Sequence, residues 1–179
     1  GVFEAGGEAV PMEELLQAWE GKLEPIYPCN IAQGQKEIPT LSAHGDSWKK
    51  PLIKAAKPRV LIPVFPGTNC EYDAAKAMAA AGAEPEIVVI KNLTAGAIAQ
   101  SMEHVAQRLA QAQIVFLPGG FSGGDEPDGS AKLITSFFRS GQVKEQVNEL
   151  LKNRDGLMLG VCNGFQALIK LGLVPYGEI

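Results

Sequence analysis

A short apolar run that ends in a glycine-flanked cysteine constrains the fold of this chain more than any other feature. Residues 156–159 read Gly-Leu-Met-Leu, residues 160–164 read Gly-Val-Cys-Asn-Gly, and a helical pattern follows. A strand that turns sharply into a helix leaves no room for side chains beside the turn, which explains the two glycines. The pattern predicts a nucleophile elbow, with Cys162 in a strained backbone conformation at the carboxyl end of a strand.

This predicted position has a chemical consequence for the Cys162 thiol. The partial positive charge at a helix N-terminus favours the thiolate, which is the nucleophilic form of cysteine. The alternative interpretation is a buried structural cysteine beside a tight turn, because free cysteine is among the most buried residue types. The glycine spacing favours a catalytic cysteine.

Composition excludes several classes of partner. With 179 residues and 46% apolar content, the chain suits roughly one soluble globular domain. Its net charge of −4 offers no basic surface for nucleic acid or for an anionic membrane, and no apolar run approaches the length of a membrane span. Cys29, Cys70 and Cys162 form neither a disulfide framework nor a metal-binding spacing, so we expect a reducing, cytoplasmic setting and no metal site.

The first 57 residues differ in their sequence pattern from the remainder. Apolar residues recur at helical spacing between Met12 and Leu23, directly after Pro11, which predicts one short amphipathic helix. Prolines and glycines then interrupt the chain too often for regular elements. We therefore expect a linker or surface-hugging connection over residues 24–57.

From Arg59 onward, strand and helix patterns alternate. The predicted strands are 59–65, 86–90, 114–117 and 156–159, and the predicted helices are 71–81, 95–110, 131–138 and 143–152. Such alternation predicts an α/β fold with an open, mostly parallel sheet and helices on both faces. Pro63 lacks a ladder hydrogen bond and should weaken the outer half of the first strand.

Three loops follow the predicted strands at their carboxyl ends, where parallel sheets gather their sites. They are residues 66–73, residues 118–125 and the elbow, and they should converge at one edge of the sheet. The second loop, Pro-Gly-Gly-Phe-Ser-Gly-Gly-Asp, could direct backbone N–H groups toward an oxyanion, as acyl transfer to a cysteine requires. Its alternative interpretation is a simple glycine-rich turn.

The remaining polar candidates have simpler interpretations. Asn69 is expected to bond within its own turn, and Cys70 to be a packed thiol rather than a second nucleophile. The acidic group at residues 125–128 is interpreted as a solvated loop rather than a cation site. Both histidines, His44 and His104, are expected to face water.

Two of these loops carry a family resemblance. The Pro-Gly-Gly-Phe-Ser motif at 118–122, followed by Val-Cys-Asn-Gly-Phe-Gln at 161–166, resembles the glutaminase domain of class I glutamine amidotransferases, which have a flavodoxin-like α/β fold. Residues 66–73, Pro-Gly-Thr-Asn-Cys-Glu-Tyr-Asp, narrow the resemblance to the amidotransferase part of phosphoribosylformylglycinamidine synthases. Residues 123–132 suggest the large, fused form, and residues 15–28 resemble the end of its synthase portion.

The resemblance implies a division of the chain and a set of roles. Residues 1–57 would be the end of the synthase portion plus a linker, and residues 58–179 the N-terminal part of the amidotransferase domain. Cys162 would attack the side-chain amide of glutamine to form a γ-glutamyl thioester and release ammonia. The oxyanion hole would comprise the backbone N–H of Asn163 with that of one residue of the glycine loop. The candidates there are Gly120 and Phe121.

The substrate and partners follow from the same resemblance. Gly119 and Gln166 would help to hold glutamine. Ammonia would pass to the synthase portion, where ATP and magnesium drive amidation of formylglycinamide ribonucleotide in de novo purine biosynthesis, so no cofactor is expected on the present chain.

The family's catalytic histidine and glutamate lie downstream of the elbow, whereas this sequence stops at Ile179. The resemblance therefore implies a truncated piece that is a poor or inactive glutaminase alone. A truncated sheet would also leave an edge and an apolar face uncovered, so we expect self-association.

Three other classes share parts of the pattern. A cysteine hydrolase or chaperone-like protein of the DJ-1/PfpI type has the elbow and the sheet, but not the paired motifs at 118–122 and 161–166. A non-catalytic docking module could use the same fold. A flavodoxin-type nucleotide binder should have serine and threonine after the first strand, where this chain has Gly-Thr-Asn-Cys-Glu.

Overall fold

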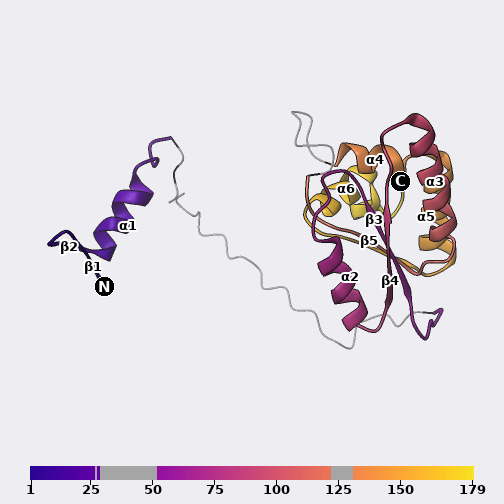
Figure 1. Cartoon of the computed structure of the whole chain (residues 1–179), viewed down its shortest axis with the longest axis horizontal. Helices are drawn as coiled ribbons and strands as arrows, with labels where there is room; N and C mark the ends of the chain where they lie inside the picture. The colour runs from indigo at the N-terminus through magenta and orange to yellow at the C-terminus, as the bar shows by residue number, and fades with distance from the viewer. Residues whose placement is uncertain (27, 29–51, 122–130) are drawn as a thin grey trace. The chain divides into compact units, whose positions relative to one another are not determined.

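The computed structural model describes residues 1–26, 28, 52–121 and 131–179. The chain divides into two compact units, Gly1–Trp48 and Lys49–Ile179, and each is described by itself. Figure 1 shows the helices and strands of both units.

The first unit holds a hairpin and a helix. Strands β1 (Val2–Ala5) and β2 (Glu8–Pro11) pair antiparallel, and α1 (Met12–Gly21) follows directly. Gly6 and Gly7, at φ of 61° and 85°, form the two-residue turn that a hairpin favours. The predicted helix is confirmed, but the hairpin was not expected from its short strands. The apolar residues of α1 are all exposed within this unit, including Trp19 at 77%.

The second unit is built on a four-stranded parallel sheet with the order β4-β3-β5-β6. The strands are β3 (Arg59–Val64), β4 (Glu84–Val89), β5 (Ile114–Leu117) and β6 (Leu157–Gly160). This confirms the predicted open, parallel α/β sheet. Because β4 and β5 lie on opposite sides of β3, the strand order reverses between β3 and β5. Ligand sites of open α/β sheets form at such a switch point.

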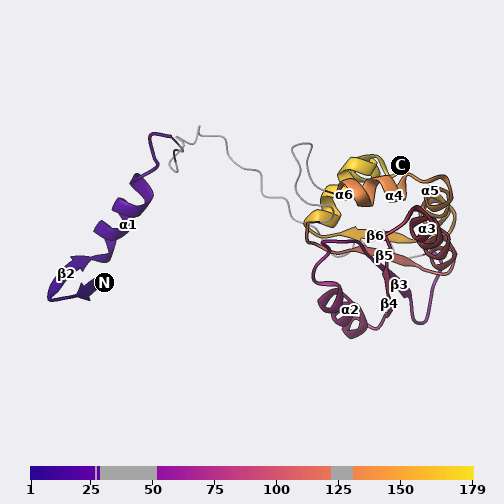
Figure 2. The same cartoon turned by 45° about the horizontal axis from the view of Figure 1, so that its top comes forward.

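Helices cover both faces of the sheet, as predicted. They are α2 (Glu71–Ala80), α3 (Ala95–Leu109), α4 (Lys132–Phe138), α5 (Gly141–Asn148), α6 (Asn163–Leu171) and α7 (Leu173–Tyr176), with a π-helical turn, η2 (Glu149–Asn153), after α5. Figure 2 shows α2 on one face and α3 to α6 on the other. In the described part of the chain, no helix is both long enough and apolar enough to cross a bilayer.

Alternation along the strands divides the core into two layers. Leu61 of β3 belongs to the larger layer, with Val115 and the buried faces of α3 to α6. Val60 and Ile62 point the other way, into a smaller layer beneath α2 that includes Phe116. The period of two along a strand places successive side chains on opposite faces, so these apolar strands are buried on both sides.

Pro63 weakens only one side of its strand. Strand β3 pairs with β4 through Val64, but its pairing with β5 ends at Leu61 opposite Val115. The Val64 carbonyl accepts from Ile90 of the β4 side, and backbone groups alternate sides along a strand, so Pro63 faces β5. The expectation of a weaker outer half is therefore correct for the β5 side and wrong for the β4 side, because only one ladder needs the missing N–H.

Candidate active site

Cys162 occupies the turn between β6 and α6. Its backbone angles, φ 50° and ψ −109°, lie in a region that L-residues rarely adopt, and the residue is the N-cap of α6. The thiol is free and exposed. The strained conformation expected of a nucleophile elbow is thus confirmed. The alternative of a buried structural cysteine is wrong, because the residue is exposed. Such strain persists only where the surrounding structure imposes it.

The two glycines of the elbow are required by close packing. A Cβ on Gly164 would overlap the backbone carbonyl of Leu117 in β5, and a Cβ on Gly160 would lie 2.6 Å from the backbone of Gly164. The helix therefore begins directly against the neighbouring strand. This contact fixes the height of Cys162 above the end of the sheet.

The first turn of α6 brings two further candidates beside the cysteine. Gln166 donates its backbone N–H to the Cys162 carbonyl at 2.9 Å, and its side chain is exposed. Asn163 is 1% exposed, and its Nδ2 lies 3.4 Å from Gln166 Oε1. Because Asn163 directly follows Cys162 at the start of α6, its backbone N–H is the group that could act in an oxyanion hole.

The glycine loop (residues 118–121) lies against the elbow. A Cβ built on Gly119 would be 3.4 Å from the Cβ of Cys162 and 3.7 Å from the Val161 carbonyl oxygen. The β3–α2 loop (residues 66–70) joins it, because Asn69 N–H donates to the Gly119 carbonyl at 2.9 Å. The predicted convergence of the three loops at the carboxyl edge of the sheet is confirmed.

A hydrogen bond between the glycine loop and the β3–α2 loop indicates which of the two candidate residues could supply the second oxyanion donor. Phe121 N–H donates to the Gly67 carbonyl at 2.8 Å, so it is already engaged. Gly120, at φ 120°, pairs with Thr68 as an antiparallel bridge and has no room for a side chain, because a Cβ there would overlap Gly67. The geometry therefore favours the Gly120 N–H. No sequence pattern predicts the hydrogen bond that the backbone N–H of Asn69 makes outside its own turn.

Other residues from the sequence analysis lie apart from this cluster or are not described. Cys70 is exposed at φ 68° as the N-cap of α2, so the expectation of a packed thiol is wrong; a turn at positive φ directs it to solvent. His104 is exposed on α3, as expected, beside strand β4. Ser122, the acidic residues 125–128 and His44 lie outside the described residues. Within the described ranges, no group of three or more His, Cys, Asp or Glu side chains could hold a metal ion.

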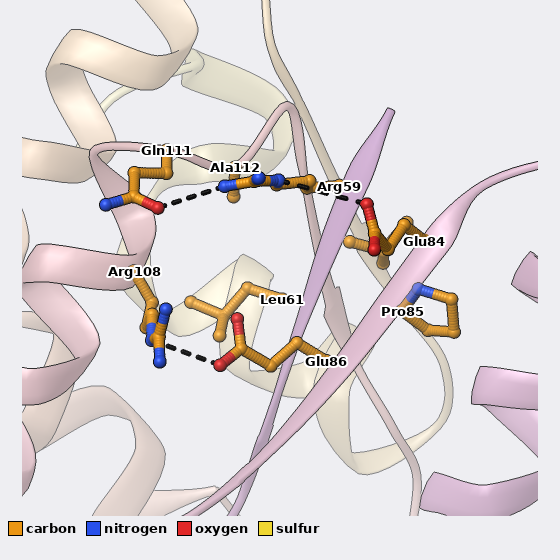
Figure 3. Close-up of a pocket in the computed structure, with 9 residues that line it drawn as sticks. Arg59, Leu61, Glu84, Pro85, Glu86, Arg108, Gln111 and Ala112 are labelled. Carbon is orange, nitrogen blue, oxygen red and sulfur yellow. Dashed lines mark hydrogen bonds and ion pairs between the residues drawn. The ribbon is translucent and has the colours of Figure 1, made fainter. Parts of the chain in front are cut away.

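A separate pocket of about 340 Å³ opens at the opposite end of the sheet (Figure 3). Arg108 Nε on α3 pairs with Glu86 at 3.0 Å, and Arg59 Nη1 donates a hydrogen bond to Gln111 Oε1 at 3.0 Å. Arg59 also lies 3.9 Å from Glu84. The glutamates and Arg59 lie at the amino ends of β3 and β4, and the other two side chains lie at the end of α3. Cys162 follows the carboxyl end of β6, so the pocket is not part of the elbow site.

The sheet, the strained cysteine and the adjoining glycine loop define a class of protein. An exposed thiol between a strand and a helix N-terminus, beside backbone donors, is the arrangement of an α/β protein with a cysteine nucleophile for acyl transfer. Residues 57–179 match the family model of the CobB/CobQ-like glutamine amidotransferase domain, and the chain belongs to this family.

Similar proteins carry more specific names. The chain is 38% identical over 120 residues to the phosphoribosylformylglycinamidine synthase subunit PurQ of Dehalococcoides mccartyi, covering 67% of this chain and 42% of the relative. It is 36% identical over 126 residues to PurQ of Methanococcus maripaludis, covering 68% and 42%. A solved structure of PurLQS from Thermotoga maritima is 30% identical, with a TM-score of 0.44, over 65% of this chain and 45% of that one. The chain thus matches less than half the length of these relatives.

Proposed function

We propose that this chain carries the cysteine-bearing part of the glutaminase of a phosphoribosylformylglycinamidine synthase. The observation that carries the proposal is Cys162 itself, exposed at φ 50° with Gly119 against its Cβ. Family membership supports glutamine as the substrate, and the names of the relatives support the purine-biosynthetic enzyme as its setting. The free thiols of Cys70 and Cys162 suit a reducing, cytoplasmic compartment.

The proposed reaction is an acyl transfer from nitrogen to sulfur. The Cys162 thiolate attacks the side-chain carbonyl of glutamine, and the carbonyl oxygen becomes an oxyanion that the Gly120 and Asn163 N–H groups stabilise. The carbon–nitrogen bond breaks as the oxyanion collapses, and the departing nitrogen takes up the proton that the thiol lost on ionising, so ammonia leaves. Water then adds to the γ-glutamyl thioester, and the carbon–sulfur bond breaks to release glutamate and restore the thiol. Gly119 and Gln166 would help to hold the substrate.

Ammonia would be consumed by the synthase portion of the same enzyme, in its fused large form. ATP and magnesium would bind there and activate formylglycinamide ribonucleotide for amidation. On this proposal, residues 1–57 are the end of that synthase portion with its linker, and residues 58–179 are the first part of the glutaminase domain.

The chain alone should hydrolyse glutamine poorly. His104 lies on α3 beside β4, at the opposite edge of the described sheet from β6 and Cys162. A general base in reach of the nucleophile commonly contributes about 10²–10⁴-fold to the rate. Glutamine turnover by the isolated chain at the rate of an intact synthase would contradict this part of the proposal.

The outer side of β6 supports the expected self-association. Its Leu157 and Leu159 side chains are 63% and 43% exposed, and β6 ends the order of the described sheet. Edge strands with exposed apolar residues readily pair with another chain. We expect sedimentation velocity to show dimers or larger species that Leu157→Lys reduces, and a monomer at every concentration would refute this point.

The central test is covalent labelling by a glutamine analogue. The chain is treated with 6-diazo-5-oxo-L-norleucine, with and without excess glutamine, and the modified residue is mapped by mass spectrometry. We expect a single adduct on Cys162 that glutamine prevents and that Cys162→Ser abolishes. Cys70 is the internal control, since it is also a free, exposed thiol at a helix N-cap.

Three outcomes would count against a glutamine site. Equal labelling of Cys70 and Cys162 would show general thiol reactivity. Labelling of Cys162 that glutamine does not slow would instead favour a hydrolase of the DJ-1/PfpI type, and no labelling at all would favour a docking module.

A further inference from the structure

The glycine loop beside Cys162 is held by a neighbouring loop that the proposed reaction does not use. Asn69 N–H donates to the Gly119 carbonyl at 2.9 Å, and Phe121 N–H donates to the Gly67 carbonyl at 2.8 Å. Thr68 lies between these two bonds, opposite Gly120. The two loops follow β3 and β5, the strands that flank the switch point of the sheet.

The bond from Asn69 determines the direction of the proposed oxyanion donor. The Gly119–Gly120 peptide is trans, so its carbonyl oxygen and its N–H point in opposite directions within one plane. Since Asn69 holds the oxygen, the Gly120 N–H points away from the β3–α2 loop. Gly119 lies against Cys162, so the orientation of the Gly119–Gly120 peptide determines whether an N–H donor is available to an oxyanion beside the thiol.

Thr68 anchors the β3–α2 loop to the core. Its N–H donates to the Phe65 carbonyl at 2.9 Å, and its Oγ1 accepts from Phe65 N–H at 3.0 Å. Phe65 is only 2% exposed, and its ring packs edge-on against Phe137 at 5.3 Å. Two hydrogen bonds to one buried, packed residue therefore fix the place where the loop leaves β3.

We propose that Thr68 is a positioning residue for acyl transfer at Cys162. Its hydroxyl holds the β3–α2 loop, and this loop in turn orients the Gly120 N–H through the bond between Asn69 and Gly119. The inference rests on the proposed function, and it adds a residue that the proposed reaction does not use. Replacement of the hydroxyl by a methyl group removes the acceptor for Phe65 N–H while preserving the shape of the side chain.

The test compares Thr68→Val with Thr68→Ser in the full 179-residue chain. The first variant lacks the hydroxyl and the second keeps it. Labelling of Cys162 by 6-diazo-5-oxo-L-norleucine is followed over a range of concentrations, which separates the limiting rate from the concentration at half-maximal rate. Iodoacetamide serves as a comparison reagent, because its reaction needs no glutamine pocket.

For Thr68→Val we expect a limiting rate roughly 10- to 100-fold lower, since misplacing a catalytic group by about 1 Å can cost about 100-fold. The half-maximal concentration and the iodoacetamide rate should not change, and Thr68→Ser should restore the limiting rate. A merely structural role would slow both reagents or lower the melting temperature alone. Unchanged labelling by the valine variant would overturn the proposal.

The outcome is distinguishable from a failure of the proposed function. If the unmodified chain gives no glutamine-protected labelling of Cys162, the proposed function fails before the variants are compared. Amide hydrogen exchange in the unmodified chain then tests the geometry, and it also serves if the valine variant does not fold. We expect Asn69 and Phe121 amides to exchange at least about tenfold more slowly than Gly120, because hydrogen-bonded amides must open first. Equal exchange would overturn the proposal.

Discussion

At the carboxyl end of the sheet, backbone groups make the close contacts around Cys162, whereas at the amino end charged side chains line the pocket of Figure 3. Around the elbow, Gly160 and Gly164 leave no space for even a methyl group. Around the pocket, the side chains of Arg108 and Glu86 remain 41% and 43% exposed. Two ends of one sheet thus differ in how closely they are packed.

This difference shows which end of the sheet restricts its residues more tightly, and therefore where substitutions should affect the candidate active site. A hollow lined by solvated ion pairs is compatible with many side chains, because exposed pairs contribute only about 0–1 kcal/mol. A strained residue enclosed by glycines is compatible with very few. We therefore expect substitutions at the carboxyl end to affect both folding and labelling of Cys162, and those at the amino end to affect only stability.

The largest effect is expected for Gly164→Ala. The added methyl group would overlap the Leu117 carbonyl, and overpacking of this kind typically costs about 1–3 kcal/mol. The helix would also shift away from β5, so labelling of Cys162 by the glutamine analogue should be lost. Urea denaturation and mass spectrometry measure the two effects.

Gly96→Ala is the matched control for that substitution. Its new Cβ would be 4.0 Å from Thr94 Oγ1 near the start of α3, where alanine is the better helix former by up to about 1 kcal/mol. We expect equal or higher stability and unchanged labelling. If both alanine variants behaved alike, close packing at the elbow would not be the cause.

A smaller loss of stability is expected for Arg154→Met at the amino end. The Arg154 guanidinium donates to the carbonyls of Leu109 at 2.7 Å, Ala110 at 2.9 Å and Ala112 at 3.1 Å, where α3 ends. Methionine keeps much of the apolar stem but no donor, and hydrogen bonds to charged groups contribute about 1.5–3 kcal/mol. Denaturation should show a loss of this order with labelling of Cys162 intact. Lost labelling in a folded variant would contradict the separation of the two ends.

The Arg108–Glu86 pair should contribute less. A double-mutant cycle with Arg108→Gln and Glu86→Gln is expected to give a coupling of about 0.2–1 kcal/mol, because both side chains are partly solvated. Added salt should reduce the coupling further. A coupling above about 2 kcal/mol would show that this pocket is more rigid than its exposure indicates.

The smallest effect is expected at Glu178, in the last residues of the chain. Its hydrogen bond to Lys152 at 2.9 Å, together with the charge of that lysine, lowers the pKa of the Glu178 carboxyl from its ordinary value of 4.5. A lowered folded-state pKa stabilises the fold above the unfolded pKa, and this contribution is lost as the pH falls through the folded value. Glu178→Gln should therefore slightly flatten the fall in urea midpoint below about pH 4.5. An unchanged profile would show that the pair contributes nothing.

Most of the second unit follows from local pattern. Short apolar runs and helical spacing between them predicted the four strands and the helices, and the bounds of β5 agree residue for residue. The elbow was equally visible, because its glycines and its cysteine are neighbours in sequence. The hairpin β1–β2 was missed, since strands of four residues around two glycines carry little pattern.

The amino-acid sequence by itself determined the parallel α/β sheet and the strained, glycine-flanked Cys162, because alternating apolar runs and the spacing of glycines around a cysteine are local patterns. The contact that excludes a side chain at Gly164 is with Leu117 of β5, so the tertiary structure supplied that reason. Only the tertiary structure decided that Phe121 N–H is engaged, that Cys70 faces solvent and that Asn69 holds the Gly119 carbonyl. Hydrogen bonds between loops some 50 residues apart arise from the strand order, with β3 beside β5. Backbone groups make those bonds, and every residue except proline carries the same backbone donor, so no residue type signals them.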